Sequence, residues 1–173
     1  MPAAHSRKQS RVSFARLVDI RALSIRQPWA ELILRRRKPI EIRTWKSEYR
    51  GWLLIHASGN WEAASARELG ISKDAVTQGA FVGIAKVKEI RPFTRKDANL
   101  LKKKRGGDGW WGPGQLAWVL KSVHRIEPIP FKGRLGLFRP PARVLHRVAK
   151  GLKTQRRGRQ LGHLLRQGWA AAR

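Results

Sequence analysis

The feature that most constrains the fold is a series of short apolar runs between residues 23 and 58, each bounded by proline, glycine or charged residues. Residues 22–25 predict a short strand because an alternating apolar pattern stops there at a Gln-Pro pair. Proline suits the first turn of a helix, so a helix is predicted over residues 28–36. Residues 38–43 alternate and predict a second strand, and residues 52–57 form an apolar run typical of a buried strand.

The second of these strands carries an acid between two bases. Alternation places Ile40 and Ile42 on one face and Glu41 and Arg43 on the other, with Lys38 just before them. Glu41 could accept a proton while the two cations stabilise a phosphate or an oxyanion. The same residues could equally form structural ion pairs with their neighbours. The spacing alone leaves both interpretations open.

Further elements follow from turn signals and periodicity. An alanine-rich helix is predicted over residues 60–69, with Asn60 as its N-cap and a glycine just after its end. Residues 80–90 predict a long strand in which Gly83 marks a bulge. Residues 115–125 predict the last long strand. Residues 142–150 predict a short helix with an apolar face.

The segment between residues 92 and 109 is polar and predicts a loop with a run of bases at its centre. Such a run is often a solvated surface, but it could also grip phosphates non-specifically. Two tryptophans follow the run, where a base could stack on them. The residues concerned are Lys102, Lys103, Lys104, Arg105, Trp110 and Trp111.

The charge balance narrows the partners. In 173 residues there are 38 Lys and Arg against 11 Asp and Glu, a net charge of +27. Self-repulsion on this scale disfavours a compact state unless a polyanion neutralises it, and nucleic acid is the usual polyanion. Apolar runs are too short to span a bilayer, so we expect no membrane partner. The amino-terminal residues lack the apolar core of a secretory signal, and we expect a cytoplasmic protein.

Composition also bounds the chemistry. The chain has no cysteine, which excludes disulfides, thiol catalysis and cysteine–zinc sites. The five histidines show no metal-ligand spacing, and no dinucleotide or Walker glycine pattern is present, so we predict no cofactor and no metal. Of the tryptophans, Trp52 and Trp118 lie in strand patterns and are expected in the core. Trp45 lies at a strand end, where it could stack on a base.

Four sequence pieces resemble the ASCH (activating signal cointegrator homology) domain family of the PUA-like superfamily. They are LSIRQPWA from Leu23, the segment Lys38–Trp45, YRGWLLIHAS from Tyr49, and KGRLGLF from Lys132. The resemblance implies an α+β fold built on a PUA-like β-barrel over residues 19–140. A basic tail (1–18) and a basic helical extension (141–173) would flank it. It also implies an unpaired or flipped base as the ligand.

The resemblance places a cleft at the family's Gly-x-Lys-x-x-Glu-x-Arg signature, which Lys38, Glu41 and Arg43 match. Arg36 departs from it, because it stands where the family has glycine. Some relatives resemble amidohydrolases that use a threonine three residues after the lysine, and Glu41 occupies that place. Without the hydroxyl the nucleophilic route is missing, so this activity is not carried over.

Two further positions keep alternative readings. His56 ends a strand and is either a buried, hydrogen-bonded histidine or a donor in the cleft. Residues 132–136 place two bases between glycines and form either a tight turn or a phosphate-binding loop.

The leading hypothesis is an RNA-binding protein that holds a nucleotide in a basic cleft. The first alternative is an RNA-acting hydrolase, a metal-independent ribonuclease or modified-nucleoside enzyme, in which Lys38 and Glu41 would be catalytic. The second is a structural basic protein associated with DNA or the ribosome. The oligomeric state is left open. The residues predicted to contact nucleic acid are Arg26, Arg36, Lys38, Glu41, Arg43, Trp45, Arg50, His56, Ser58, Lys102, Lys103, Lys104, Arg105, Trp110, Trp111, Lys132 and Arg134.

Overall fold

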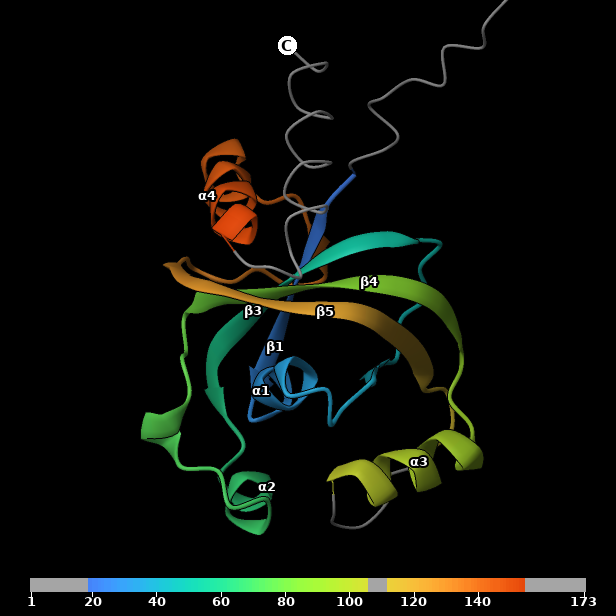
Figure 1. Cartoon of the computed structure of the whole chain (residues 1–173). Coiled ribbons are helices and arrows are strands. Elements are labelled where there is room, and N and C mark those ends of the chain that lie inside the picture. The colour runs from blue at the N-terminus through green and yellow to red at the C-terminus, as the bar shows by residue number, and fades with distance from the viewer. Residues whose placement is uncertain (1–18, 106–111, 155–173) are drawn as a thin grey trace, which may run out of the picture.

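The structure is a computed structural model that describes residues 19–102 and 112–152, with the backbone alone for 103–105 and 153–154. Six strands form one mixed sheet in the order β2-β5-β4-β3-β1-β6 (Figure 1). The β1–β3 pair is parallel and the other pairs are antiparallel. The strands are β1 (Arg21–Gln27), β2 (Ile40–Arg43), β3 (Gly51–Trp61), β4 (Ala80–Pro92), β5 (Leu116–Pro130) and β6 (Leu137–Phe138). The helices are α1 (Trp29–Leu34), α2 (Ala63–Glu68), the 3₁₀ turn η2 (Lys73–Ala75), α3 (Arg95–Arg105) and α4 (Ala142–Thr154).

The sheet curves around α1, and α4 lies on its outer side (Figure 1). The predicted α+β class is confirmed. In the described residues β2 and β6 are the edges of the sheet, and no backbone ladder joins them. Closure into a barrel therefore stays a prediction. No helix in the described part of the chain has the length and apolar character needed to cross a bilayer.

Alternation along the strands divides most apolar side chains between two large cores, because successive strand residues point to opposite faces, and a third, smaller cluster packs against α3. The inner core lies between the sheet and α1, and the outer core lies between the sheet and α4. The inner core includes Leu23, Ile25, Ile33, Leu53, Ile55 and Trp118. The outer core includes Ala22, Leu54, Phe81, Ile84, Val144, Val148 and Leu152.

A bulge in β4 confirms the prediction at Gly83. The register with β5 shifts between Phe81 and Gly83, and a Cβ at Gly83 would lie 2.2 Å from a methyl group of Leu34. Phe81 and Ile84, three residues apart, both lie in the outer core, and Val82 and Ala85 both lie in the inner one. Strict alternation therefore fails at this point, and the extra residue lets α1 approach the sheet closely.

The predicted helix over 60–69 is shorter than expected at its start. Asn60 is wrong as an N-cap, because strand pairing continues to Trp61 and α2 begins at Ala63. Its end agrees with the prediction: Gly70 follows the helix with a φ of 62°. The helix predicted over 142–150 is confirmed as α4.

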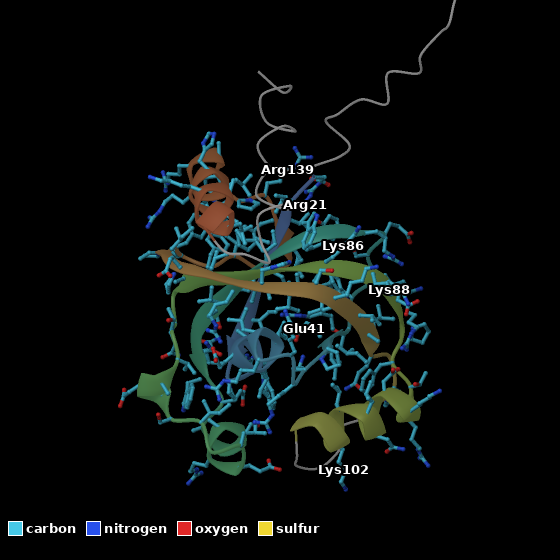
Figure 2. The ribbon with its side chains drawn as sticks, in the orientation of Figure 1. Arg21, Glu41, Lys86, Lys88, Lys102 and Arg139 are labelled. Carbon is cyan, nitrogen blue, oxygen red and sulfur yellow. The ribbon has the colours of Figure 1, made fainter. Side chains whose placement is uncertain are left out.

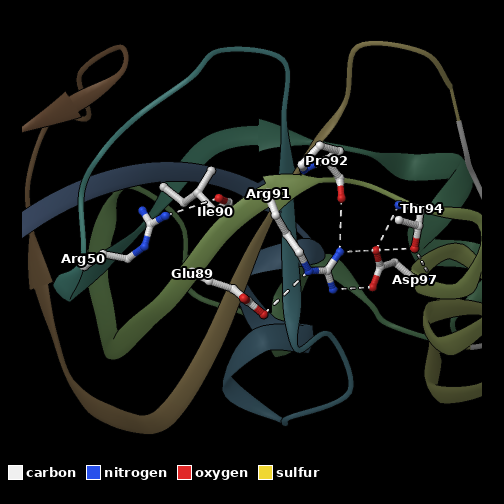
Figure 3. Close-up of polar contacts among 7 residues, drawn as sticks. All are labelled: Arg50, Glu89, Ile90, Arg91, Pro92, Thr94 and Asp97. Carbon is white, nitrogen blue, oxygen red and sulfur yellow. Dashed lines mark hydrogen bonds and ion pairs between the residues drawn. The ribbon is translucent and has the colours of Figure 1, made fainter.

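The polar segment predicted as a loop is wrong in its first half, where residues 95–105 form α3. Thr94 and Asp97 cap its start reciprocally. The Asp97 carboxylate accepts from the Thr94 backbone N–H at 2.9 Å, and the Asp97 N–H donates to Thr94 Oγ1 at 3.3 Å. Arg91, at the end of β4, donates two hydrogen bonds to the same carboxylate at 2.6 and 2.8 Å (Figure 3). Ala98 and Leu101 then bury one face of α3.

This cap predicts a pH-dependent contribution to stability. Arg91 above all, together with Thr94, holds the pKa of Asp97 far below its usual range despite burial. A carboxyl whose folded pKa is depressed stabilises the fold above its unfolded pKa, near 4, and loses that contribution as pH falls through the folded value. Asp97→Asn should therefore lower the free energy of unfolding by about 2 kcal/mol at neutral pH. The deficit should shrink below about pH 4.

Urea unfolding at neutral and acidic pH measures this effect. Asp74→Asn is the matched control, because Asp74 is exposed in η2 and no ion pair among the described residues involves it. The control should change stability by less than about 0.5 kcal/mol. An equal loss in both variants, or a deficit at Asp97 that does not vary with pH, would contradict the assignment.

Candidate nucleic-acid interface

The signature residues of β2 form a buried ion-pair network. Lys38 and Glu41 are 5% and 6% exposed, and the Lys38 ammonium donates to the Glu41 carboxylate. It also donates to the Ile40 carbonyl oxygen at 2.8 Å. Arg43 Nε lies 3.1 Å from the other oxygen of Glu41. Both carboxylate oxygens therefore face a cation, and Figure 2 shows Glu41 inside the curve of the sheet.

Ser24 joins this network to the far end of the chain. An Arg43 Nη atom donates to the Ser24 carbonyl oxygen at 2.8 Å, which ties edge strand β2 to β1. The Ser24 hydroxyl accepts from the Arg134 backbone N–H at 3.2 Å and donates to the Arg134 carbonyl oxygen at 3.0 Å. Lys38, Glu41, Arg43 and Arg134 thus form one continuous chain of contacts, although 110 residues separate Ser24 from Arg134.

The loop over residues 132–136 lies tightly against β1 and β3. A Cβ at Gly133 would come within 2.6 Å of the His56 ring and 2.7 Å of Ser24 Oγ, so only glycine fits there. The loop holds its own cations outward: Lys132 and Arg134 are exposed. Leu135, between the glycines, is fully exposed.

His56 supports this loop from beneath. It is 1% exposed, and its Nε2 hydrogen-bonds with the Phe131 carbonyl oxygen at 2.8 Å. Burial lowers the pKa of the imidazole, although the Phe131 carbonyl opposes the shift. The geometry agrees with the buried, hydrogen-bonded reading of His56 rather than with a residue that lines a cleft.

Trp45 presents an aromatic surface beside the network. Its ring packs edge-on against Trp118 at 4.7 Å between centroids, and Trp118 is fully buried. Trp45 itself is partly exposed. Trp45 is therefore held in place by the core while part of the residue remains accessible, and an accessible aromatic side chain can stack on a base.

The remaining predicted residues do not join this cluster. Arg26 pairs with Glu62, and Arg50 donates to the Tyr49 and Ile90 carbonyl oxygens. Ser58 accepts a long bond from the Asn60 N–H at 3.4 Å. Lys102 is exposed on α3 and lies well apart from Glu41 in Figure 2. The side chains of Lys103, Lys104 and Arg105, and the whole of Trp110 and Trp111, lie outside the described residues.

A pocket of about 300 Å³ opens next to Lys38. It brings Lys38 together with Arg36 and with Lys121, which the sequence did not single out. The pocket is lined by Ile33, Arg36, Lys38, Pro39, Leu120, Lys121, Ser122 and Val123. Because Lys38 is held by Glu41 and the Ile40 carbonyl, Arg36 and Lys121 are the cations that could meet a small anionic group there.

A larger groove of about 850 Å³ contains Arg50 together with two arginines that sequence reasoning missed. Arg21 and Arg139 come together because Ala22 pairs with Phe138 in the β1–β6 ladder. Their nearness is visible in Figure 2. The nearness of Arg21 and Arg139 follows from the antiparallel pairing of β1 with β6. The local sequence around the two arginines does not predict that pairing.

The backbone explains the departure at Arg36. Its φ is +59°, in the left-handed region that glycine adopts without strain. The glycine that the resemblance implies at this position would make the reversal after α1 without strain. Here Arg36 adopts the same conformation, and its guanidinium donates to the Val123 carbonyl oxygen at 3.2 Å.

Most of the acidic residues that the structure describes form ion pairs with basic residues. At least six acids among the described residues pair with eight basic residues, mostly arginines. The acids are Asp19, Glu31, Glu41, Glu62, Glu89 and Asp97. Because the sequence has 11 acids in all, the excess of 27 positive charges has few protein groups left to neutralise it.

A comparison with family models decides the family. The model of the ASCH domain matches residues 23–130, more than half of the chain. The chain belongs to the ASCH domain family. Among solved structures it is similar to the ASCH protein of Zymomonas mobilis, with 14% identity and a TM-score of 0.48 over 76% of this chain and 94% of that one. A point variant of that protein gives 15% identity and a TM-score of 0.46, over 72% and 92% of the two chains. Comparison with curated proteins gives no match.

In this ASCH domain, the buried network predicts a stability difference between one and two substitutions. Glu41→Gln leaves the Lys38 ammonium buried without its counter-ion and should lower the free energy of unfolding by about 3–5 kcal/mol. The double variant Lys38→Met/Glu41→Leu removes both charges and should lie within about 2 kcal/mol of the wild type. Chemical denaturation compares them. A double variant as unstable as the single one would contradict a paired, buried network.

The left-handed residue predicts a reversed preference between glycine and alanine. At position 36, glycine should give a protein about 1 kcal/mol more stable than alanine, because alanine is strained at φ +59°. At position 35, where φ is −77°, alanine should be more stable than glycine by about 0.5–1 kcal/mol. Thermal unfolding of the four variants measures both differences. The same order at both positions would contradict the backbone explanation.

Proposed function

We propose that this ASCH domain binds nucleic acid, RNA in preference to DNA, through a strip formed by Arg43, Trp45, Lys132 and Arg134. The observation that supports it most is the assembly around Ser24. One serine joins the partly exposed Arg43 to the loop that carries the exposed Lys132 and Arg134. Family membership supports association with nucleic acid. The unneutralised charge supplies the attraction to phosphates.

Each residue of the strip has a distinct task. Trp45, fixed by Trp118, offers a face to an unpaired base. Arg43 can still donate from its exposed portion while Glu41 and Ser24 hold its orientation. Lys132 and Arg134 meet the backbone of the same strand. Lys38 and Glu41 are positioning residues in this proposal, because both are buried in the ion pair.

The hydrolase alternative would require Lys38 and Glu41 to be released from their ion pair. A general base needs an oxygen that is available to the substrate, but both Glu41 oxygens are already occupied by cations. Lys38 is also held by two acceptors. No contact among the described residues favours turnover, so binding is the function we propose. The domain boundaries at residues 18 and 140 and a cytoplasmic location remain parts of the proposal.

Binding to a fluorescent oligouridylate at several salt concentrations tests the proposal. Affinity should fall steeply between about 50 and 200 mM salt. Arg134→Glu should weaken binding about tenfold and lower the slope of log K against log salt by about 1, because one phosphate contact is lost. Arg134 is exposed and its side chain makes no hydrogen bond or ion pair among the described residues, so stability should be unchanged.

Arg67→Glu on α2 is the matched control, since it makes the same charge change at an exposed residue outside the strip. It should weaken binding far less than Arg134→Glu. An oligodeoxythymidylate of the same length compares DNA with RNA. A wild type with no salt-dependent affinity for RNA would overturn the function. Equal effects of the two variants would overturn the strip.

A further inference from the structure

The outer face of the sheet carries a second cluster of aromatic and basic side chains. Strand register places Trp52 of β3, Lys86 of β4 and Lys121 of β5 in one row across three strands. Residues that pair in register point to the same face. Lys86 and Lys121 are exposed and Trp52 is partly exposed. Lys88 is exposed two residues further along β4, and Figure 2 shows both β4 lysines well away from Lys102.

The neighbouring row adds His124. It pairs with Ile84, and its ring lies 6.2 Å from that of Trp52. Lys121 and His124 are three residues apart, a spacing that regular alternation would send to opposite faces. The register shift between Ile84 and Lys86, with Ser122 at a φ of +52°, puts both in register with residues of one face of β4. The bulge therefore assembles this cluster.

The row contains a like-charge pair that folding does not require. Lys86 and Lys121 are direct cross-strand partners, and like charges opposite each other destabilise a sheet. Among the described residues, no ion pair involves Lys86, Lys88 or Lys121. Glu89, which follows Lys88 in sequence, forms an ion pair with Arg91 instead. The positive charge of this face is thus complementary to an external anion.

We propose that this outer strip (Trp52, Lys86, Lys88, Lys121 and His124) binds single-stranded nucleic acid. The lysines contact successive phosphates and Trp52 stacks with one base. The proposal rests on the nucleic-acid binding proposed above and extends it to a second surface. α4 packs on the outer core next to the strip and the lysines of the row are exposed, so a strand could cross β3, β4 and β5 without displacing any element that the structure describes.

The lysines allow a test in which binding and stability move in different directions. Lys86→Glu turns the like-charge pair into an attractive one, so it should leave the melting temperature unchanged or raise it. The same change should weaken binding to oligouridylate and oligodeoxythymidylate by about tenfold and lower the salt slope by about 1 or more. Lys73→Glu in η2 is the control, because it makes the same charge change at an exposed lysine outside the strip.

Ultraviolet crosslinking to the same oligonucleotides, with identification of the crosslinked peptides, gives an independent readout. The peptide that contains Trp52 should be modified in the wild type and much less in Lys86→Glu. If the wild type binds RNA but Lys86→Glu binds as well as Lys73→Glu does, the outer strip is overturned while the proposed function stands. A Lys86-dependent affinity for phosphatidylserine vesicles, without an effect on RNA, would also overturn it. Failure of the wild type to bind any RNA would overturn both.

Discussion

The buried pairing of Glu41 with Lys38 and Arg43 is the interaction on which the arrangement of the site depends. Edge strand β2 has only β5 as a backbone partner, and its other side reaches β1 through the Arg43 guanidinium. A buried Lys38 ammonium needs a nearby carboxylate as its counter-ion, so the role of Glu41 is primarily structural. Arg43 is the most exposed residue of this ion-pair network and is therefore the one that can contact a ligand.

The two proposed surfaces differ in how their cations are held. Around Ser24, an ion pair, a backbone hydrogen bond and a glycine that admits no side chain fix the geometry. On the outer face, the lysines have no protein partner among the described residues and face each other across strands. A fixed guanidinium beside a tryptophan suits recognition of one nucleotide. Unpaired lysines suit a phosphate backbone of any sequence.

Sequence patterns predicted the local elements well where the signal was local. The alternation at Ile40 and Ile42 placed Glu41 and Arg43 together on the other face, as the cores show. The sequence predicts the bulge at Gly83 because the long strands of a small barrel need to bend. α3 was missed because its bases hide a narrow apolar face, although Thr94 and Asp97 carry a capping signal. The sequence places Arg36 where the family has glycine, but only the structure gives the backbone angle, a φ of +59°, that favours glycine there.

The sequence by itself determined the α+β class, most strand and helix positions, the family resemblance and the large positive charge, because periodicity, turn residues and composition are local properties. Only the tertiary structure decided which charges meet. The meeting of Ser24 with Arg134, of Arg21 with Arg139 and of Lys86 with Lys121 depends on strand order, register and bulges. A single-residue change of register would move each side chain to the opposite face, and no local pattern encodes that choice.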